Sequence, residues 1–379
     1  MTTASIKTEM LVWARERAGF SVSELAKKCS VSEDRLLEWE TGIRGITFKQ
    51  AMTYASKVHI PFGYLFLARP PVDELSIPDL RTVDSQVLHS ASANLKDLIK
   101  LMQFRQEWYR DHLKQQFAEP NPIVGSFSDR RQADAIVKDI RNKLGYVARP
   151  SKGSWEDYYR ELVGRIEQIG ILVMRQADMG HFTRPLSVEE FRGFALVDEY
   201  APLIFINDND SPGAKLFTLL HELCHIWIGQ TGISDGGMSS HHPEETLCNA
   251  VAAEFLVPAI EFHKEWNPDR EDWRENLPDL EAIFHVSTWV LARRALTLGY
   301  INQDEYNAYT YQLRQLHKSR AKPASGPDYY VVKRSQISKQ FAKAVTNEAL
   351  SGQLLLRDAS NLLGGIKPSK VAHFAEGLK

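Results

Sequence analysis

The sequence predicts a mainly α-helical chain that carries a small antiparallel β-sheet. Apolar side chains recur at helical spacing over most of its length, as in the long amphipathic segment from Leu95 to Gln116. Three short β-rich runs interrupt this pattern, at residues 171–174, 194–198 and 203–207. Only a short turn separates the last two runs, so we expect them to pair as a β-hairpin.

The composition is typical of a globular protein. A length of 379 residues suggests two or three domains, and a hydrophobic share of 43% excludes a disordered chain. The net charge of -2 excludes the overall basic field of a dedicated nucleic-acid binder. Cys29, Cys224 and Cys248 are too few and too scattered for a disulfide framework. No signal-peptide core and no run of about 18 apolar residues is found, so we expect a cytoplasmic protein without a membrane span.

Shifts in composition divide the chain into four parts. Residues 1–70 have the pattern of several short helices, and residues 71–120 contain a proline-rich linker and the long helix. Residues 121–318 contain the β-rich runs and the helices around them. A segment rich in proline, serine and glycine then precedes a helical tail at residues 328–379. We expect this tail to pack as a separate subdomain.

The motif His221-Glu222-Leu223-Cys224-His225 predicts a metal site. The two histidines are four residues apart on a helix whose start is marked by Ser211 and Pro212, so both imidazoles leave the same face and can bind one zinc ion. Glu222 lies on the adjoining flank, where it can take a proton from a water molecule that attacks a peptide carbonyl. The flanking residues are strongly apolar, which favours a buried metal site over two ordinary surface histidines.

A catalytic zinc ion needs a third protein ligand. The helix that opens at Pro243 offers three carboxylates, those of Glu244, Glu245 and Glu254. Glu245 is the preferred ligand because it shares a stripe with Asn249 beside the face that must pack. A closed, structural site formed by both histidines with Cys224 and Cys248 is the alternative, although buried cysteines more often act as small hydrophobic residues.

Three stretches around this motif resemble a known family of peptidases. They are HELCH itself, the preceding IFINDNDSPGAKLFTLLHE and the following EETLCNAVAAEFLVP. Together they resemble the ImmA/IrrE family of metallopeptidases, which pairs HExxH with a downstream glutamate. Cys224 departs from the family pattern, which often has glycine or alanine there.

The resemblance implies a zincin-like α+β domain with His221, His225 and Glu245 as zinc ligands and Glu222 as catalytic base. It also implies a zinc-dependent endopeptidase whose substrate is a regulatory protein, such as a transcriptional repressor. A helix-turn-helix transcription regulator with a structural or sensing metal site and no proteolysis is the alternative function.

Residues 9–41 have the pattern of a helix-turn-helix. Ser21 and Glu24 form a predicted capping box at the start of its second helix. With Glu40-Thr41-Gly42 at its end, the module resembles the Xre-type repressor fold. The predicted recognition helix at residues 32–41 holds four acidic residues against one arginine, which disfavours contact with DNA phosphates. DNA binding and binding of a protein partner are therefore both open for this module.

The sequence does not identify the residue that stabilises the oxyanion. The side chains of a suitable type are His181, Tyr200, His241 and His242. The strand Leu203–Asn207 is expected to hold an extended substrate by main-chain pairing.

Overall fold

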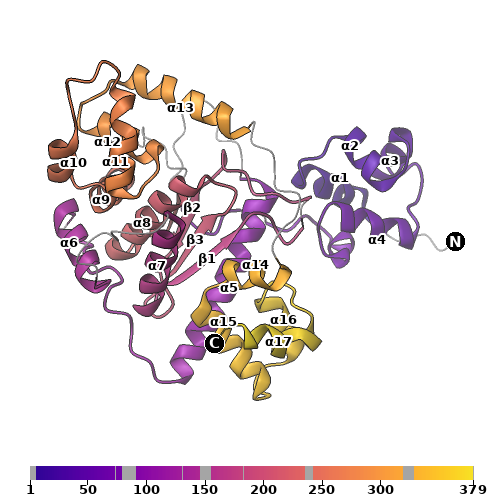
Figure 1. Ribbon diagram of the computed structural model, residues 1–379. Helices are drawn as coiled ribbons and strands as arrows, with labels where there is room; N and C mark the ends of the chain where they lie inside the picture. Colours follow the sequence, from indigo (N-terminus) through magenta and orange to yellow (C-terminus); the bar gives the residue numbers. More distant parts are fainter. Residues whose placement is uncertain are drawn as a thin grey trace. The chain divides into compact units, whose positions relative to one another are not determined.

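The computed structural model describes residues 6–72, 74–78, 91–129, 131–145, 155–181, 183–234, 242–318 and 328–378. Within these residues the chain is mainly α-helical with one small four-stranded sheet, which confirms the predicted fold class (Figure 1). Contacts divide the chain into unit 1, Met1–Ser76 with Leu88–Lys100, and unit 2, Ile77–Val87 with Leu101–Lys379. None of the described helices combines the length and the hydropathy that a membrane span requires.

Unit 1 is a helical module with its own apolar core. Its helices are α1 Thr8–Arg17, α2 Val22–Cys29, α3 Glu33–Glu40, α4 Phe48–Lys57 and the short 3-10 helix η1 Phe62–Phe66. The predicted capping box is confirmed, because Ser21 Oγ accepts from the Glu24 backbone N–H and the Glu24 carboxylate accepts from the Ser21 N–H. Only residues 30–32 join α2 to α3. The Xre-type assignment and DNA binding stay predictions.

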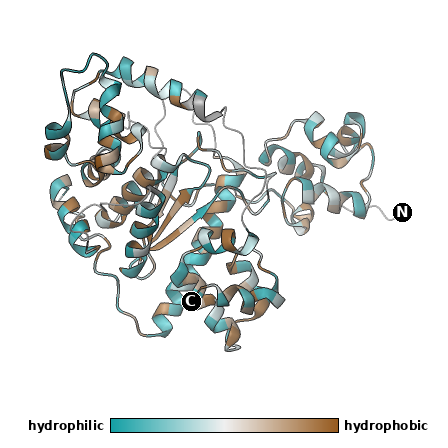
Figure 2. Cartoon of the chain, viewed as in Figure 1, coloured by the Kyte–Doolittle hydropathy of each residue, from teal (hydrophilic) through white to brown (hydrophobic). Residues whose placement is uncertain are grey.

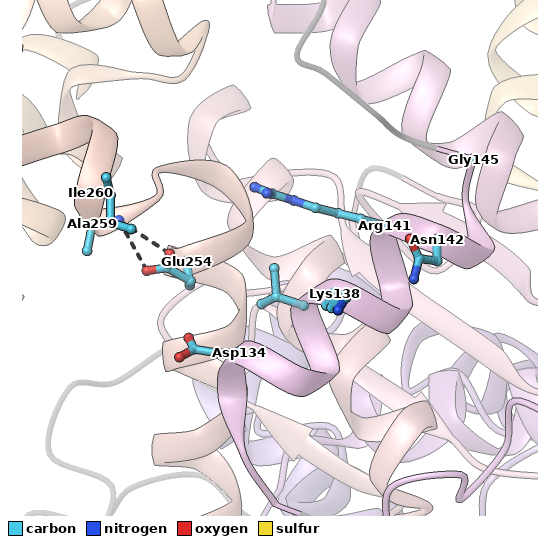
Figure 3. Close-up of a pocket in the computed structure, with 9 residues that line it drawn as sticks. Asp134, Lys138, Arg141, Asn142, Gly145, Glu254, Ala259 and Ile260 are labelled. Carbon is cyan, nitrogen blue, oxygen red and sulfur yellow. Dashed lines mark hydrogen bonds between the residues drawn. The ribbon is translucent and has the colours of Figure 1, made fainter.

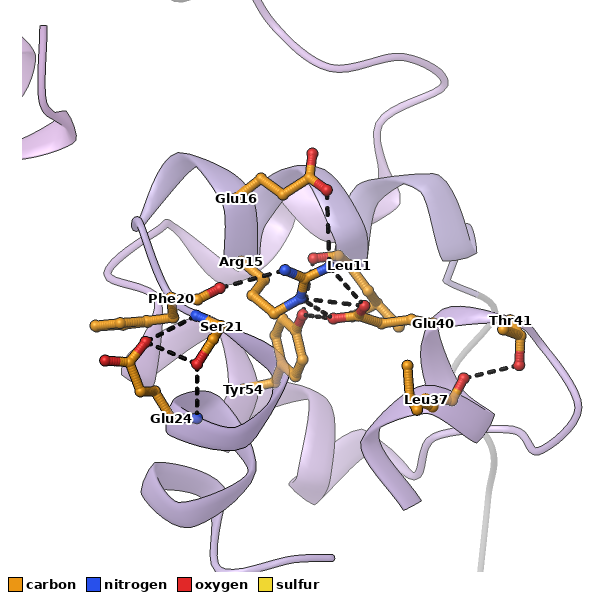
Figure 4. A network of polar contacts seen from close by, with 10 residues as sticks. All are labelled: Leu11, Arg15, Glu16, Phe20, Ser21, Glu24, Leu37, Glu40, Thr41 and Tyr54. Carbon is orange, nitrogen blue, oxygen red and sulfur yellow. Dashed lines mark hydrogen bonds and ion pairs between the residues drawn. The ribbon is translucent and has the colours of Figure 1, made fainter. Parts of the chain in front are cut away.

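A buried polar network joins α1, α3 and α4 (Figure 4). Glu40 is 7% exposed and accepts hydrogen bonds from Arg15 Nε and from the Tyr54 hydroxyl, each at 2.9 Å. Glu40 therefore faces the core of unit 1 and not a DNA groove.

The exposed side of α3 is also less acidic than its sequence suggests. Glu38 forms ion pairs with Arg35 at 3.3 Å and with Arg44 at 3.7 Å. Counting acids along α3 therefore overestimated its repulsion of phosphate, since two of the four acids have arginine partners.

The sheet of unit 2 is mixed, whereas the sequence predicted an antiparallel one. Its strands are β1 Leu172–Gln176, β2 Gly193–Leu196, β3 Leu203–Asn207 and β4 Gly232–Ser234, in the order β1-β3-β2-β4. β2 pairs antiparallel with β3 and with β4, so the predicted hairpin is confirmed. β1 pairs parallel with β3. The direction of β1 cannot be predicted from its own residues. It depends on the long connection at 177–192, after which β2 lies on the far side of β3.

The helices of unit 2 bury this sheet. α7 Trp155–Gln168 and α8 Pro212–Ile228 lie next to each other against the strands, which belong to the most hydrophobic segments of the chain (Figure 2). α9 Pro243–Leu256 packs along α8, and α6 Ala133–Lys143 packs on α9. The elements that follow are α10 Ala259–Glu265, η2 Trp273–Asn276, α11 Leu277–Phe284, α12 Thr288–Thr297 and α13 Gln303–Lys318. α8 thus lies in the centre of the core.

The C-terminal tail packs within unit 2, and its description as a subdomain stays a prediction. Its elements are α14 Tyr329–Gln336, α15 Lys339–Leu350, α16 Leu356–Leu362, η3 Pro368–Lys370 and α17 Val371–Glu376. Phe341 contacts Trp108 and Tyr109 of the long helix α5, Ala93–Gln115, with ring centroids 5.6 and 6.0 Å apart. A flexible composition in a linker does not predict how the segments after it pack.

Candidate metal centre

Helix α8 carries the histidine motif into the core. As predicted, Ser211 is its N-cap and Pro212 its first residue, and it ends at Gly229, whose φ of 72° favours glycine. All residues from 216 to 228 are buried, including the three polar residues of the motif. Burial of polar side chains is costly unless they find partners, so these residues must be satisfied by one another or by a ligand.

Helix α9 supplies the third group of the cluster. Glu245 Oε2 lies 3.1 Å from His221 Nε2, and Glu245 Oε1 lies 3.1 Å from His225 Nε2. The two Nε2 atoms are 3.2 Å apart. The structure therefore brings together the three residues that the sequence proposes as ligands.

The spacing of these atoms fits a tetrahedral metal site. Ligand atoms about 2.0–2.1 Å from a tetrahedral zinc ion lie about 3.3–3.4 Å from each other. The measured separations of 3.1–3.2 Å are close to that value. Two imidazole nitrogens and one carboxylate leave a fourth position for water or substrate, as catalytic zinc requires.

The protonation states of the cluster also suit a metal ion. Burial lowers the pKa of His225, so its imidazole is kept neutral and retains a lone pair. Burial by itself would raise the pKa of Glu245, but hydrogen bonds and charge interactions with His221 and His225 bring it down to about 2. Glu245 is therefore a carboxylate at neutral pH.

Asn249 orients the first histidine, a role that the sequence did not predict. Its Oδ1 accepts a hydrogen bond from His221 Nδ1 at 3.1 Å. A proton on Nδ1 leaves the lone pair on Nε2, which is the atom that faces Glu245. The sequence signal for this role was the spacing of one helical turn between Glu245 and Asn249, which places Asn249 on the side of α9 that carries the proposed ligand.

Gly193 makes room for Glu222, a second role that the sequence did not predict. A β-carbon at Gly193 would lie 2.7 Å from Thr218 Cγ2 and 3.0 Å from Glu222 Oε1. Strand β2 can therefore approach α8 this closely only with glycine at its first position. Glu222 is 0% exposed, so its carboxylate is held in place by dense packing.

The two other carboxylates on α9 have different partners. Glu244 pairs with Arg131 at 2.7 Å, near the surface. Glu254 pairs with Arg294 and accepts a hydrogen bond from the backbone N–H of Ala259. Neither takes the place of Glu245 in the cluster.

Cys248 lies close to the same centre. Its sulfur and nitrogen atoms of His221 and His225 are all within 4.8 Å of one another, which makes these three residues a possible metal group. We favour Glu245 as the ligand because its oxygens are nearer, at 3.1 Å. Burial, reinforced by the neighbouring Cys224, raises the pKa of Cys248.

The candidates for oxyanion stabilisation are scattered. His181 contacts Thr183 at 2.8 Å, and Lys114 lies 4.8 Å over the ring of Tyr200. His242 is an exposed N-cap of α9, and His241 lies outside the described residues. The structure does not favour one of them.

The predicted substrate strand is wrong. β3 lies between β1 and β2, so both of its edges are already paired and cannot bind another strand. The sequence showed that Leu203–Asn207 is a strand but not its place in the sheet. β4 pairs with β2 on one side, and on the other side the Ile233 N–H donates to the Pro78 carbonyl at 3.3 Å.

A pocket of about 660 Å³ lies between α6 and the turn from α9 to α10 (Figure 3). Two of its charged side chains have partners: Arg141 donates to the Phe255 carbonyl at 2.9 Å, and Glu254 pairs with Arg294. None of the metal-site residues lines it, so it is distinct from the metal centre.

The cluster is a candidate metal centre, and a family model matches the part of the chain that contains it. Residues 167–296 match the family model described as the IrrE N-terminal-like domain, Peptidase_M78, and this stretch contains the four site residues. The match supports a metallopeptidase of the IrrE/ImmA type for this part of the chain. Residues 337–377 match a domain of unknown function, DUF8813. No curated protein and no solved structure gave a match.

Proposed function

We propose that the protein is a zinc-dependent endopeptidase. The observation that carries the proposal is the convergence of His221, His225 and Glu245 on one point, in a domain matched by a metallopeptidase family. Two histidine imidazoles and a carboxylate are a frequent donor set for catalytic zinc, which makes zinc the expected metal.

In this proposal Glu222 is the general base. Bound zinc would polarise the scissile carbonyl and make a water molecule more acidic. Glu222 accepts the proton from the attacking water and passes it to the leaving amine. Asn249 keeps His221 in the tautomer that binds metal. Tight packing by Gly193 holds the Glu222 carboxylate in position.

The substrate is proposed to be a protein segment bound in extended form along β4. On the outer side of this strand the Ile233 N–H already donates to a main-chain carbonyl, that of Pro78. A substrate would displace residues 77–78 from this position. The resemblance to the ImmA/IrrE family points to a regulatory protein, such as a transcriptional repressor, as the substrate.

The test is a comparison of new peptide N-termini in a cell extract treated with the wild type and with Glu222→Gln. We expect zinc-dependent cleavage by the wild type, removed by chelation and restored by zinc. In Glu222→Gln the rate should fall by about 10²–10⁴. Glu244→Gln is the matched control, because Glu244 pairs with Arg131 near the surface, and it should cleave as the wild type does. Zinc-loaded wild type that produces no new N-termini would overturn the proposal.

A regulator that binds DNA and does not cleave proteins is the second candidate. The arginine pairing of Glu38 favours it, because α3 then presents less negative charge to DNA than its sequence suggests. Selection of bound sequences from random duplex DNA tests this role. Specific binding together with absent proteolysis would place this candidate ahead of the peptidase.

A further inference from the structure

Arg105 of α5 is a buried cation with no counter-ion among the residues that the structure describes. Its side chain is 1% exposed, and its hydrogen bond to the described part of the chain is a long one, from Nη1 to Met102 Sδ at 3.9 Å. Its Nε has no hydrogen-bond partner, and the guanidinium forms no ion pair with any described residue. A buried guanidinium normally pairs with a carboxylate or another oxyanion, since an uncompensated buried charge is strongly destabilising.

A second cation approaches the same place from the C-terminal tail. A β-carbon built on Gly364 would lie 3.2 Å from Arg105 Nη2 and 3.6 Å from Lys333 Nζ. Both distances start from the same point, so Arg105 Nη2 and Lys333 Nζ cannot be farther apart than the two distances added together. Lys333 is half-buried, and its ammonium lies 5.9 Å from the Tyr329 ring without an ion pair to the described part of the chain.

Burial disfavours the charged form of both groups, and for Lys333 the like charge of Arg105 adds to this effect. Burial lowers the pKa of Arg105 to about 10. Burial and the neighbouring Arg105 lower the pKa of Lys333, and Asp178 offsets this only in part. An anion between the two groups would relieve both penalties.

We propose that Arg105 and Lys333 bind a phosphate dianion beside Gly364, at the junction of α5 with the C-terminal tail. Arg105 supplies a planar fork of N–H donors, and Lys333 supplies a mobile point charge. Phosphate oxygens accept such charge-assisted hydrogen bonds at about 2.7–2.9 Å from the nitrogen, so one phosphate group can bridge the two nitrogens.

The charge of the site favours phosphate over a carboxylate. The site presents two positive charges, which a dianion neutralises and a single carboxylate does not. Gly364 has a φ of 71°, which favours glycine, and it places no side chain against the two nitrogens. The phosphate can be free inorganic phosphate or the terminal group of an organic monoester.

Calorimetric titration of the full-length protein with inorganic phosphate and with adenosine 5′-monophosphate tests this site, with sodium chloride at equal ionic strength as the blank. We expect saturable binding of phosphate by the wild type. Lys333→Gln should bind roughly tenfold to hundredfold more weakly. Lys343→Gln, a change at an exposed lysine on α15, should bind as the wild type does.

The two titrants identify the source of the phosphate. Tighter binding of the monophosphate indicates an organic monoester, whereas equal or weaker binding indicates inorganic phosphate. Arg105→Lys keeps the charge but loses the fork and should also bind more weakly; thermal unfolding without ligand checks that each variant is folded. Absence of saturable phosphate binding, or unchanged binding by folded Lys333→Gln, would overturn the proposal. Because binding is measured in the absence of proteolysis, this result is independent of the peptidase proposal.

Discussion

Two buried polar clusters of this protein differ in their balance of hydrogen-bond donors and acceptors. In unit 1, the Glu40 carboxylate accepts from a guanidinium and a hydroxyl on neighbouring helices. In unit 2, the atoms of His221, His225 and Glu245 that face one another can all offer lone pairs, and they lie 3.1–3.2 Å apart. The first cluster is complete by itself, whereas the second is completed by a cation at its centre.

The difference shows that burial of charge does not by itself indicate a functional site. A network with matched donors and acceptors stabilises a fold, and a cluster with an excess of one kind has room for a ligand of the opposite kind. Arg105 and Lys333 are the reverse case, because they are donors only. The predictions below separate these roles, beginning with the change of largest expected effect.

Removal of the Glu40 carboxylate should disrupt the polar network of unit 1, because this carboxylate is the acceptor that the network shares. Glu40→Ala leaves Arg15 and Tyr54 without their common partner, so we expect the stability of unit 1 to fall by about 3–5 kcal/mol. Hydrogen exchange of the amides in α1 to α4 measures the loss. Glu38→Ala, which removes a partly exposed ion pair from the same helix, should cost only about 0–1 kcal/mol. Equal effects of the two changes would show that the network around Glu40 is not what stabilises unit 1.

Removal of Asn249, which orients the proposed ligand His221, should lower the zinc affinity of the metal centre without abolishing it. Asn249→Ala deletes the acceptor for His221 Nδ1, so we expect zinc affinity to fall by roughly tenfold to hundredfold. Competition with a chelator of known affinity measures this. Thr246→Ala on the exposed side of α9 is the control. An unchanged affinity in Asn249→Ala would mean that another group orients His221.

The smallest effect is expected from the glycine beside Glu222. In Gly193→Ala the new methyl group meets Thr218 and Glu222, so unfolding should become easier by about 1–3 kcal/mol and cleavage slower. Gly164→Ala on α7 has open space and should raise stability by roughly 0.5–1 kcal/mol. Urea unfolding compares the two. Wild-type stability and activity in Gly193→Ala would remove the packing argument for Glu222.

The sequence predicted the helices and strands around the metal centre because their signals are local. The spacing of His221 and His225, the capping residues and the apolar runs each act within a few residues. The sequence could also propose Glu245, because it lies on a predictable helix. That proposal needed a second helix to pack beside the first, which only the long-range packing of α8 and α9 provides.

The features that sequence analysis missed depend on contacts between distant segments. The parallel direction of β1 and the central place of β3 follow from how the chain returns to the sheet, and neither strand encodes it. The same holds for Gly193 against Glu222 and for Arg105 against Gly364, where residues far apart in the chain meet. Counting the acids of α3 overestimated the negative charge on its surface, because Glu40 is buried by contacts with other helices.

The most direct test of the metal centre is the zinc content of the purified wild type beside Glu245→Gln and Cys248→Ser. Mass spectrometry of the intact protein and of its bound metal gives the stoichiometry. We predict about one zinc ion per chain in the wild type and in Cys248→Ser, and a strongly reduced content in Glu245→Gln. Full occupancy in Glu245→Gln, or loss of zinc in Cys248→Ser, would contradict the assignment and favour a closed structural site.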